Sequence, residues 1–322
     1  MKLSQLFFIL FLFSSFAVSA QVTLPYSINK EGLPSDTSKL MLSTSKGGTT
    51  PGFFAICGIP EGQIAPDFIL YDTDGKASQL SKLLSDGKPV LLIAASFTCP
   101  KSRKSIKDKL HSINGTYGDK INIRIIYTID AHPVGPDICP YTGAVFTTSA
   151  NIRDSVLMHQ PNTYAQRKEI AGTLIDAYDI TVPVLIDSPS NAWWLTYGPA
   201  PNNAYLISPR GVVYKKYAWL ESIDFRNDIG SLLNDKRAMK TNVETEIAIE
   251  KDIKTGKAYL HVKDGSSYIV NIRNASGELV YNENVIVPKF DLSKARLLRG
   301  QQYVVHVKTS GNESYCLPYR QE

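Results

Sequence analysis

Two residues that can do nucleophilic and proton-transfer chemistry each follow a strand-like stretch. Cys99 comes shortly after the apolar run Val90–Ala95, and His132 comes shortly after the β-branched run 121–129. Strands of one parallel sheet place their carboxyl ends, and with them the chemistry, at one edge. A thiolate is a nucleophile, and an imidazole exchanges protons near neutral pH. The spacing therefore predicts a cysteine–histidine site. A half-buried structural cysteine is the alternative interpretation.

A helix is expected directly after Cys99. Pro100 suits the first helical position, where a missing N–H costs nothing, and apolar residues recur at helical spacing: Ile106, Leu110 and Ile113. Cys99 would then be the N-cap residue. Unpaired backbone N–H groups and the helix dipole stabilise an anion at that place. We therefore expect the Cys99 thiol to ionise more readily than a free cysteine.

The first turn of this expected helix carries three cations, Lys101, Arg103 and Lys104. Cations at a helix N-terminus oppose the dipole and are unfavourable there. A thiolate or a bound anion would offset that cost.

Further polar and thiol groups accompany the two central residues. Ser96 and Thr98 offer hydroxyls that could hydrogen-bond the sulfur, and Asp130 precedes His132 by two positions, where a carboxylate could fix the imidazole tautomer. Phe97 stands where a second local cysteine could have acted. Cys139, seven residues after His132, is the candidate resolving cysteine. Alternatively, Cys139 is paired with Cys57 or left free.

The order of expected elements predicts an α/β fold, a thioredoxin-like three-layer sandwich over residues 61–235. Strands alternate with helices in this part, which favours a mostly parallel sheet covered on both faces. From about residue 245 to 322, short alternating strands separated by turns predict a small antiparallel β-sandwich. Residues 21–60 are rich in Ser, Thr, Gly and Pro, as is typical of an extended arm.

Composition and the N-terminus predict an exported globular protein. The chain has 322 residues, 43% hydrophobic and 20% charged residues and a net charge of +5. No basic tract interleaved with aromatic residues is present, which argues against nucleic-acid binding. Residues 1–20 read as a signal peptide, with Lys2, an apolar run and a small-residue cleavage site. We expect a periplasmic, cell-surface or extracellular protein with no membrane span after signal removal, and no metal site.

Three segments resemble the iodothyronine deiodinase family, including its bacterial cysteine-containing relatives. They are SFTCP (96–100), YTIDAHP (127–133), and VPVLIDSPSNAWWLTYG with PNNAYLISPRGVVYKK (182–216). The resemblance covers about residues 60–235. It implies that Cys99 is the nucleophile, that His132 is the proton donor or relay, and that Asp130 stands where Glu is usual. It also implies supporting roles in the hydrogen-bond network for Ser96, Thr98 and Tyr127.

The chain departs from that family in the loop that should lie against the nucleophile. Asn202 and Asn203 stand where Glu-Arg is usual, so a bidentate anchor for a substrate carboxylate is missing from this predicted substrate loop. A peroxiredoxin-like peroxidase is the alternative enzyme, since Ser96-x-x-Cys99 fits its hydroxyl-x-x-Cys element. The proline expected before that element is missing.

The segments YIVNIRNASGELVYNENV and FDLSKARLLRGQQYVVHVKTSGNES resemble the C-terminal sorting domain of the bacterial type IX secretion system. This implies the secretion machinery as a partner. The alternative is an ordinary β-sandwich used for adhesion or spacing.

Together these features predict an exported thiol-dependent oxidoreductase acting on a halogenated, peroxidic or disulfide substrate. No cofactor is expected apart from an external thiol or a thioredoxin-type reductant. A non-catalytic cell-surface protein that binds a ligand on the same scaffold is the competing hypothesis.

Overall fold

The structure is a computed structural model that describes residues 24, 27–28, 32–42, 54, 57–220, 225–239, 247–252, 255–262, 267–274, 279–309 and 314–321. The predicted signal peptide lies outside these residues, as does much of the predicted N-terminal arm. The described part of the arm includes β1 (Ser27–Ile28), which is the edge strand of the main sheet and pairs in parallel with β2 (Asp67–Asp72).

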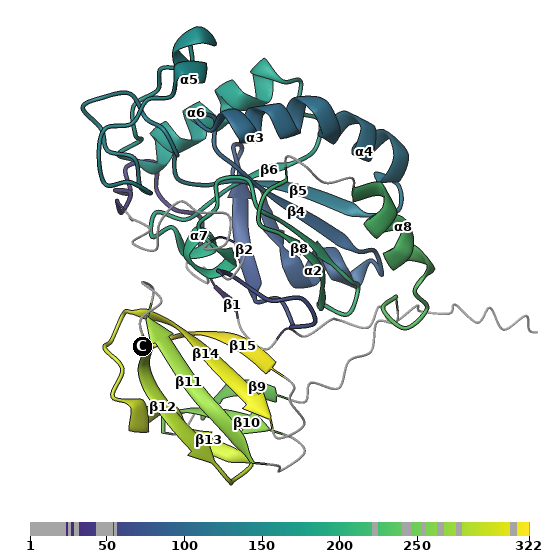
Figure 1. Ribbon diagram of the computed structural model, residues 1–322, viewed down its shortest axis with the longest axis vertical. Coiled ribbons are helices and arrows are strands. Elements are labelled where there is room, and N and C mark those ends of the chain that lie inside the picture. The colour runs from purple at the N-terminus through teal and green to yellow at the C-terminus, as the bar shows by residue number, and fades with distance from the viewer. Residues whose placement is uncertain are drawn as a thin grey trace, which may run out of the picture.

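A single mixed sheet organises the first part of the chain (Figure 1). Its strand order is β1-β2-β6-β5-β4-β7-β8, with β3 paired to β2. The bounds are β2 (Asp67–Asp72), β3 (Ala77–Gln79), β4 (Val90–Ala95), β5 (Asn122–Tyr127), β6 (Val184–Ile186), β7 (Ala204–Ile207) and β8 (Val213–Tyr217). The pairs β1–β2, β4–β5 and β5–β6 are parallel, whereas β2–β3, β2–β6, β4–β7 and β7–β8 are antiparallel.

The expectation of a mostly parallel sheet is therefore wrong, although the α/β thioredoxin-like class is confirmed. Parallel pairing is confined to the three central strands and to the short pair of β1 with β2. The short turn at residues 208–212 joins β7 to β8, and a connection this short permits only an antiparallel pair. The two strand-like stretches on either side of Pro209-Arg210 predict this hairpin from the sequence, and the pair β7–β8 confirms it.

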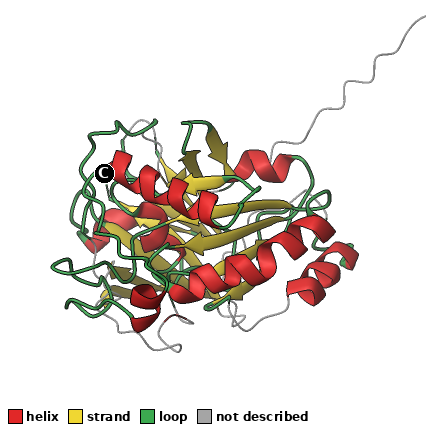
Figure 2. Ribbon diagram, turned by 90° about the horizontal axis from the view of Figure 1, so that it is seen from above, coloured by secondary structure: helices red, strands yellow, loops and turns green. Residues whose placement is uncertain are grey.

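Helices cover both faces of the sheet (Figure 2). One face packs against α4, the π-helical turn Ile106–Leu110 before it, α6 and α8, and the other against α2 and α7. The bounds are α2 (Leu80–Ser85), α3 (Pro100–Ser105), α4 (His111–Tyr117), α5 (Ser149–Arg153), α6 (Tyr164–Ala177), α7 (Ala192–Tyr197) and α8 (Phe225–Asn234). The sequence did not predict α5, which lies in the long loop after β5.

Strand β4 is buried along its whole length because its side chains alternate between two cores. Leu91 and Ile93 pack in the cluster beneath α3 and α4, while Leu92 and Ala94 pack in the cluster beneath α2 and α7. This is the pattern of a strand covered on both faces. The strand therefore fixes the position of the Cys99 loop at its carboxyl end.

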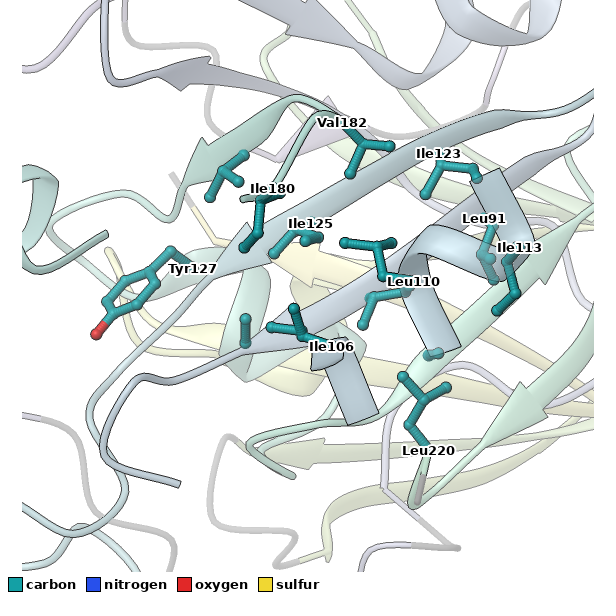
Figure 3. Close-up of a cluster of buried hydrophobic side chains, with 14 of the residues drawn as sticks. Leu91, Ile106, Leu110, Ile113, Ile123, Ile125, Tyr127, Ile180, Val182 and Leu220 are labelled. Carbon is teal, nitrogen blue, oxygen red and sulfur yellow. The ribbon is translucent and has the colours of Figure 1, made fainter. Parts of the chain in front are cut away.

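The helix predicted after Cys99 forms as three consecutive segments. A π-helical turn, Ile106–Leu110, joins α3 to α4. The expected apolar face is confirmed, since Ile106, Leu110 and Ile113 are all buried against the strands (Figure 3). This packing anchors the helix that begins at Pro100.

The C-terminal part forms two antiparallel sheets around one shared core. One sheet has the order β13-β10-β9 and the other β12-β11-β14-β15. The strands are β9 (Ile247–Lys251), β10 (Ala258–Val262), β11 (Tyr268–Asn274), β12 (Leu279–Val285), β13 (Lys289–Asp291), β14 (Gln302–Thr309) and β15 (Ser314–Arg320), with a 3-10 turn at Leu292–Ala295. The predicted antiparallel class is confirmed, and β13 and β15 are additional strands.

Within the part of the chain that the structure describes, no helix is both long enough and apolar enough to cross a membrane.

Candidate functional site

Cys99 lies at the junction between the loop after β4 and helix α3. It is the N-cap residue, with an extended backbone (φ −87°, ψ 112°), and Pro100 follows in the first helical turn. Its carbonyl oxygen accepts the backbone N–H of Arg103 at 3.1 Å, which starts the helix. The predicted strand–cysteine–helix arrangement is therefore present.

The environment of the Cys99 thiol opposes ionisation. The residue is 2% exposed, and this burial raises the pKa of the thiol to about 11. Hydrogen bonds from the backbone N–H groups of Ser102 and Lys101, and the charges of Arg103 and Lys101, act in the opposite direction. Desolvation is the larger effect. The expectation of a lowered thiol pKa is thus wrong for this state of the protein.

Apolar and aromatic residues supply that burial. Cys99 belongs to a cluster with Cys139, Tyr141, Trp194 and Ala200, among others. Cys139 is fully buried in this cluster, and both cysteines are free thiols, as is Cys57. The candidate resolving cysteine therefore shares one environment with the candidate nucleophile.

Aromatic side chains close this cluster. The Phe54 ring meets Tyr141 and Trp219 edge-on, at centroid distances of 5.8 and 5.1 Å. The Tyr141 hydroxyl donates to the carbonyl oxygen of Pro199 at 2.6 Å and accepts the indole N–H of Trp194 at 3.3 Å. The Cys99 thiol is therefore packed in a cluster of aromatic side chains in which Tyr141 is held by hydrogen bonds.

A polar network lies at the other side of the Cys99 loop, centred on the buried carboxylate of Asp130. The Tyr127 hydroxyl lies 2.9 and 3.0 Å from its two oxygens. The Ser96 hydroxyl, the Thr98 hydroxyl and the Thr98 backbone N–H donate to Oδ1 at 3.2, 3.1 and 3.3 Å. Burial raises the pKa of Asp130, and these hydrogen bonds act to lower it.

The same two hydroxyls join the cysteine loop to the histidine loop. Ser96 Oγ accepts the backbone N–H of Ala131 at 3.0 Å, and Thr98 Oγ1 accepts that of His132 at 3.0 Å. These hydroxyls bond to the backbone and to Asp130, whereas they were expected to hydrogen-bond the sulfur. Their role is therefore structural. The loops end up side by side, as the sequence predicted for neighbouring parallel strands.

The His132 imidazole lies against Phe146, with ring centroids 5.1 Å apart and an interplanar angle of 80°. Its Nδ1 is buried and has no hydrogen-bond partner among the described residues. Burial lowers the pKa of His132 to about 4; the backbone of Phe146 acts in the opposite direction, and the charge of Arg103 lowers the pKa further. The ring is neutral at pH 7. The Asp130 carboxylate bonds to the hydroxyls of Tyr127, Ser96 and Thr98 and not to the imidazole, so no hydrogen bond supports its predicted role in fixing the tautomer.

Asn151 is a residue that the sequence reasoning missed. It is fully buried in α5, and its Nδ2 donates to the carbonyl oxygens of Thr98 at 2.8 Å and His132 at 3.2 Å. Its Oδ1 accepts from Arg103 at 2.9 Å. One amide therefore ties the residue before Cys99 to the candidate proton relay. The long sequence separations gave no local signal for this.

Arg103 is the second missed residue. Its guanidinium is 3% exposed and donates to the carbonyl oxygen of Phe97 at 2.7 Å and to Asp154 at 2.9 Å, besides Asn151. It was counted among the cations of the first helical turn. In the fold it also holds the backbone of the cysteine loop.

Gln160 holds the backbone of Asp130. Its side chain accepts the backbone N–H of Asp130 at 3.1 Å and donates to the Asp130 carbonyl oxygen at 2.9 Å. The backbone of Asp130 is thereby held independently of its carboxylate.

Asn202 and Asn203 are buried, although they were predicted as a substrate loop. Asn203 Nδ2 donates to the carbonyl oxygens of Tyr197 at 2.9 Å and Gly198 at 3.1 Å, whereas the side chain of Asn202 has no partner among the described residues. Ala200 of the same loop does pack in the Cys99 cluster. The loop therefore lies against the nucleophile, and the hydrogen bonds of Asn203 give that amide a structural role. Within the described ranges, no group of three or more His, Cys, Asp or Glu side chains could hold a metal ion.

No protein-family model matches the chain, and no curated protein matches it. Solved structures that resemble it include a putative protein disulfide isomerase from Bacteroides thetaiotaomicron, with TM-score 0.36 and 18% identity, covering 57% of this chain and 92% of that one. A putative thiol:disulfide interchange protein DsbE from Chlorobium tepidum gives TM-score 0.37 and 15% identity over 57% and 100% of the chains. A peroxiredoxin-like protein from Aquifex aeolicus gives TM-score 0.35 and 12% identity over 56% and 89%.

Proposed function

We propose that this chain is a thiol oxidoreductase in which Cys99 is the nucleophile and His132 manages its proton. The observation that carries the proposal is the placement of the sulfur. It lies at the start of α3 within reach of the backbone N–H groups of Lys101 and Ser102, on a loop fixed by Asp130. Backbone N–H groups aimed at sulfur stabilise the thiolate that must form during attack.

The resting site is neutral, and this shapes the proposed chemistry. At pH 7 the buried thiol keeps its proton and the His132 imidazole is uncharged. The sulfur attacks an electrophilic atom of the substrate and loses its proton to the imidazole, which passes it to the leaving group. With a disulfide substrate, the products are a mixed disulfide with Cys99 and one free thiol.

The substrate is an electrophile that a thiol can attack: a halogenated, peroxidic or disulfide compound, of which the deiodinase resemblance implies the halogenated one. A peroxiredoxin-like peroxidase is the alternative within the same chemistry. A peroxide would convert the Cys99 thiol to a sulfenic acid and release an alcohol or water. The Cys139 thiol would then condense with the sulfenic acid, forming a disulfide and releasing water. An external thiol or thioredoxin-type reductant would restore both thiols.

The first test is Cys99→Ser in mature protein, measured as thiol-dependent turnover of peroxides, disulfides and halogenated aromatic compounds. We expect turnover to fall to background, because a serine hydroxyl is a far weaker nucleophile than a thiol. Cys57→Ser is the matched control and should keep full turnover. Equal turnover by wild type and Cys99→Ser would overturn the proposal.

The second test concerns Cys139. After one equivalent of peroxide, peptide mapping should find a disulfide between Cys99 and Cys139 in the wild type. In Cys139→Ser the sulfenic acid at Cys99 should persist long enough to be trapped by dimedone. A disulfide between other cysteines would rule out Cys139 as the resolving residue.

A non-catalytic binding protein is the second candidate, and the burial of Cys99 with its raised pKa favours it. In that case ligand binding should survive the double substitution Cys99→Ser and His132→Ala. If the double variant loses both turnover and ligand binding, the result supports the enzyme instead.

We also propose that the protein is exported and that the C-terminal sheets interact with a secretion machinery. The support is the N-terminal sequence of residues 1–20 and the motif resemblance of about residues 245–322. Cell fractionation of the full chain, beside a chain ending at residue 240, tests this. Equal distribution of the two would contradict a sorting role.

A further inference from the structure

The Cys99 thiol is covered, so part of its surroundings must move before a substrate can reach it. Cys99 and Cys139 are both buried in one apolar cluster. A nucleophile attacks only an atom that it can contact, at about 3–3.5 Å before the bond forms. The residues that cover the sulfur therefore decide which molecules reach it.

Two of the aromatic residues in this cover are fixed by hydrogen bonds. The Tyr141 hydroxyl donates to the carbonyl oxygen of Pro199, and the Trp194 indole donates to Tyr141. The backbone N–H of Trp194 also donates to the Asp187 carboxylate at 3.0 Å. Moving either residue would leave buried polar groups without partners, which is costly.

Phe54 differs from these residues because a phenyl ring has no hydrogen-bonding atom of its own. The side chain is buried, and its ring meets Tyr141 and Trp219 edge-on, at centroid distances of 5.8 and 5.1 Å. Phe54 lies outside the strands of the main sheet. The ring can therefore leave the cluster without breaking a strand pair or a side-chain hydrogen bond.

Trp219, the neighbour of Phe54, has an unsatisfied donor. Its indole Nε1 is buried and has no hydrogen-bond partner among the described residues. The Lys101 ammonium lies over the same indole, 4.7 Å from the ring centroid, which places Trp219 beside the helical turn that follows Cys99. A buried N–H without an acceptor is unfavourable, and a molecule that brings an acceptor oxygen would remove this cost.

We propose that the Phe54 ring plugs a substrate subsite beside Cys99, and that an apolar group of the substrate replaces this ring between Tyr141 and Trp219. An acceptor atom on that group would pair with the indole N–H. The inference rests on the proposed function, because it names which electrophiles gain access to Cys99. We call the place that the ring occupies the Phe54 subsite.

The plug selects substrates by the contacts that they can replace. An apolar group of about the size of a phenyl ring makes the same contacts as Phe54, whereas a small polar molecule such as hydrogen peroxide does not. A peroxide or disulfide with an apolar substituent is therefore favoured over hydrogen peroxide.

Alkylation of Cys99 by iodoacetamide at pH 8, followed by peptide mapping, measures access to the thiol. Phe54→Ala removes the ring, and we expect the rate to rise roughly tenfold because the thiol then meets both reagent and water. Leu42→Ala, at an exposed position that also precedes the main domain, is the matched control and should react like the wild type. An unchanged rate in Phe54→Ala, or the same increase in both variants, would overturn the plug.

Benzene tests whether the vacated place binds an apolar group. Apolar cavities left by removing a buried side chain bind benzene, so saturating benzene should bring the rate in Phe54→Ala to within about twofold of the wild-type rate. The wild type should be indifferent to benzene. A rate in Phe54→Ala that benzene does not lower would overturn the subsite. Phe54→Leu, which removes less of the ring, takes the place of Phe54→Ala if that variant does not fold, with the same outcomes.

Acetophenone, which adds a carbonyl oxygen to a phenyl ring, tests the indole N–H of Trp219. Adding Trp219→Phe to Phe54→Ala should raise the concentration of acetophenone that half-protects Cys99 roughly fivefold, because one hydrogen bond is lost. The half-protecting concentration of benzene should stay the same. Equal changes for the two compounds would overturn the role of the indole.

These measurements separate the plug from the proposed function, because alkylation needs no turnover. A fast, benzene-protected Cys99 in a Phe54→Ala protein that turns over no substrate supports the subsite and counts against the enzyme. Turnover that requires Cys99, in a protein whose alkylation is indifferent to Phe54, supports the enzyme and overturns the subsite.

Discussion

The two sides of the Cys99 loop differ in kind. On one side, Asp130 gathers the hydroxyls of Tyr127, Ser96 and Thr98 into a buried polar network. On the other, Cys99 itself lies among Cys139, Tyr141 and Trp194 in an apolar cluster. The polar side fixes where the loop lies, and the apolar side decides how readily the thiol ionises. Position and reactivity are thus set by different residues and can be changed separately.

The largest effect is expected from removing the centre of the polar side. Asp130→Ala leaves several buried donors without an acceptor, and each such donor costs roughly 1–3 kcal/mol. We expect a loss of about 4 kcal/mol in the free energy of unfolding, measured by urea denaturation. Asp176→Ala, at an exposed position of α6, should change it by less than about 0.5 kcal/mol. Equal small losses in both variants would show that the network does not hold the loop.

Acid should destabilise the protein through His132. The pKa of His132 is about 4 in the fold, compared with about 6.5 when unfolded, so the unfolded chain binds the proton more strongly between these values. This group contributes stability that is complete above pH 6.5 and is lost as pH falls towards 4, by about 3 kcal/mol in all.

Urea denaturation at pH 7 and at pH 4 checks this difference, with His132→Gln beside the wild type. The glutamine variant lacks the titrating ring, so its loss of stability between the two pH values should be smaller. The same loss in both proteins would mean that other groups cause it.

The link between the loops should show an intermediate effect. Asn151→Ala leaves the carbonyl oxygens of Thr98 and His132 without this donor, which costs about 2 kcal/mol of stability. If Asn151 positions the site, the pH profile of Cys99 alkylation should shift as well. Asn114→Ala, which removes a surface hydrogen bond, is the control and should leave that profile unchanged.

The smallest expected effect comes from opening the apolar side. Tyr141→Ala should admit water to the Cys99 thiol and lower its pKa from about 11. The alkylation rate at pH 8 should then rise several-fold, which corresponds to a decrease of roughly 1 kcal/mol in the apparent activation free energy. Tyr141→Phe keeps the ring and should react like the wild type. If the phenylalanine variant reacts as fast as the alanine variant, the hydroxyl bond to Pro199 rather than burial by the ring protects the thiol.

Sequence alone predicted the elements on which the site stands. The junction of β4 and α3 was predicted from the apolar run Val90–Ala95 followed by Cys99 and Pro100. The buried helix face was predicted from the spacing of Ile106, Leu110 and Ile113. Strand order along the chain predicted that the Cys99 and His132 loops would be neighbours. These are local patterns, which propensity and periodicity determine before any long-range contact forms.

The tertiary structure decided what local patterns do not contain. The helix N-terminus and nearby cations predicted a reactive thiol, but burial by Tyr141 and Trp194, from distant parts of the chain, outweighs both. The partners of Asp130 are the hydroxyls of the Cys99 loop, and Asn151 joins the two loops across more than 50 residues of sequence separation from Thr98. Desolvation and long-range hydrogen bonds depend on which segments pack together, and that is settled only when the chain is folded.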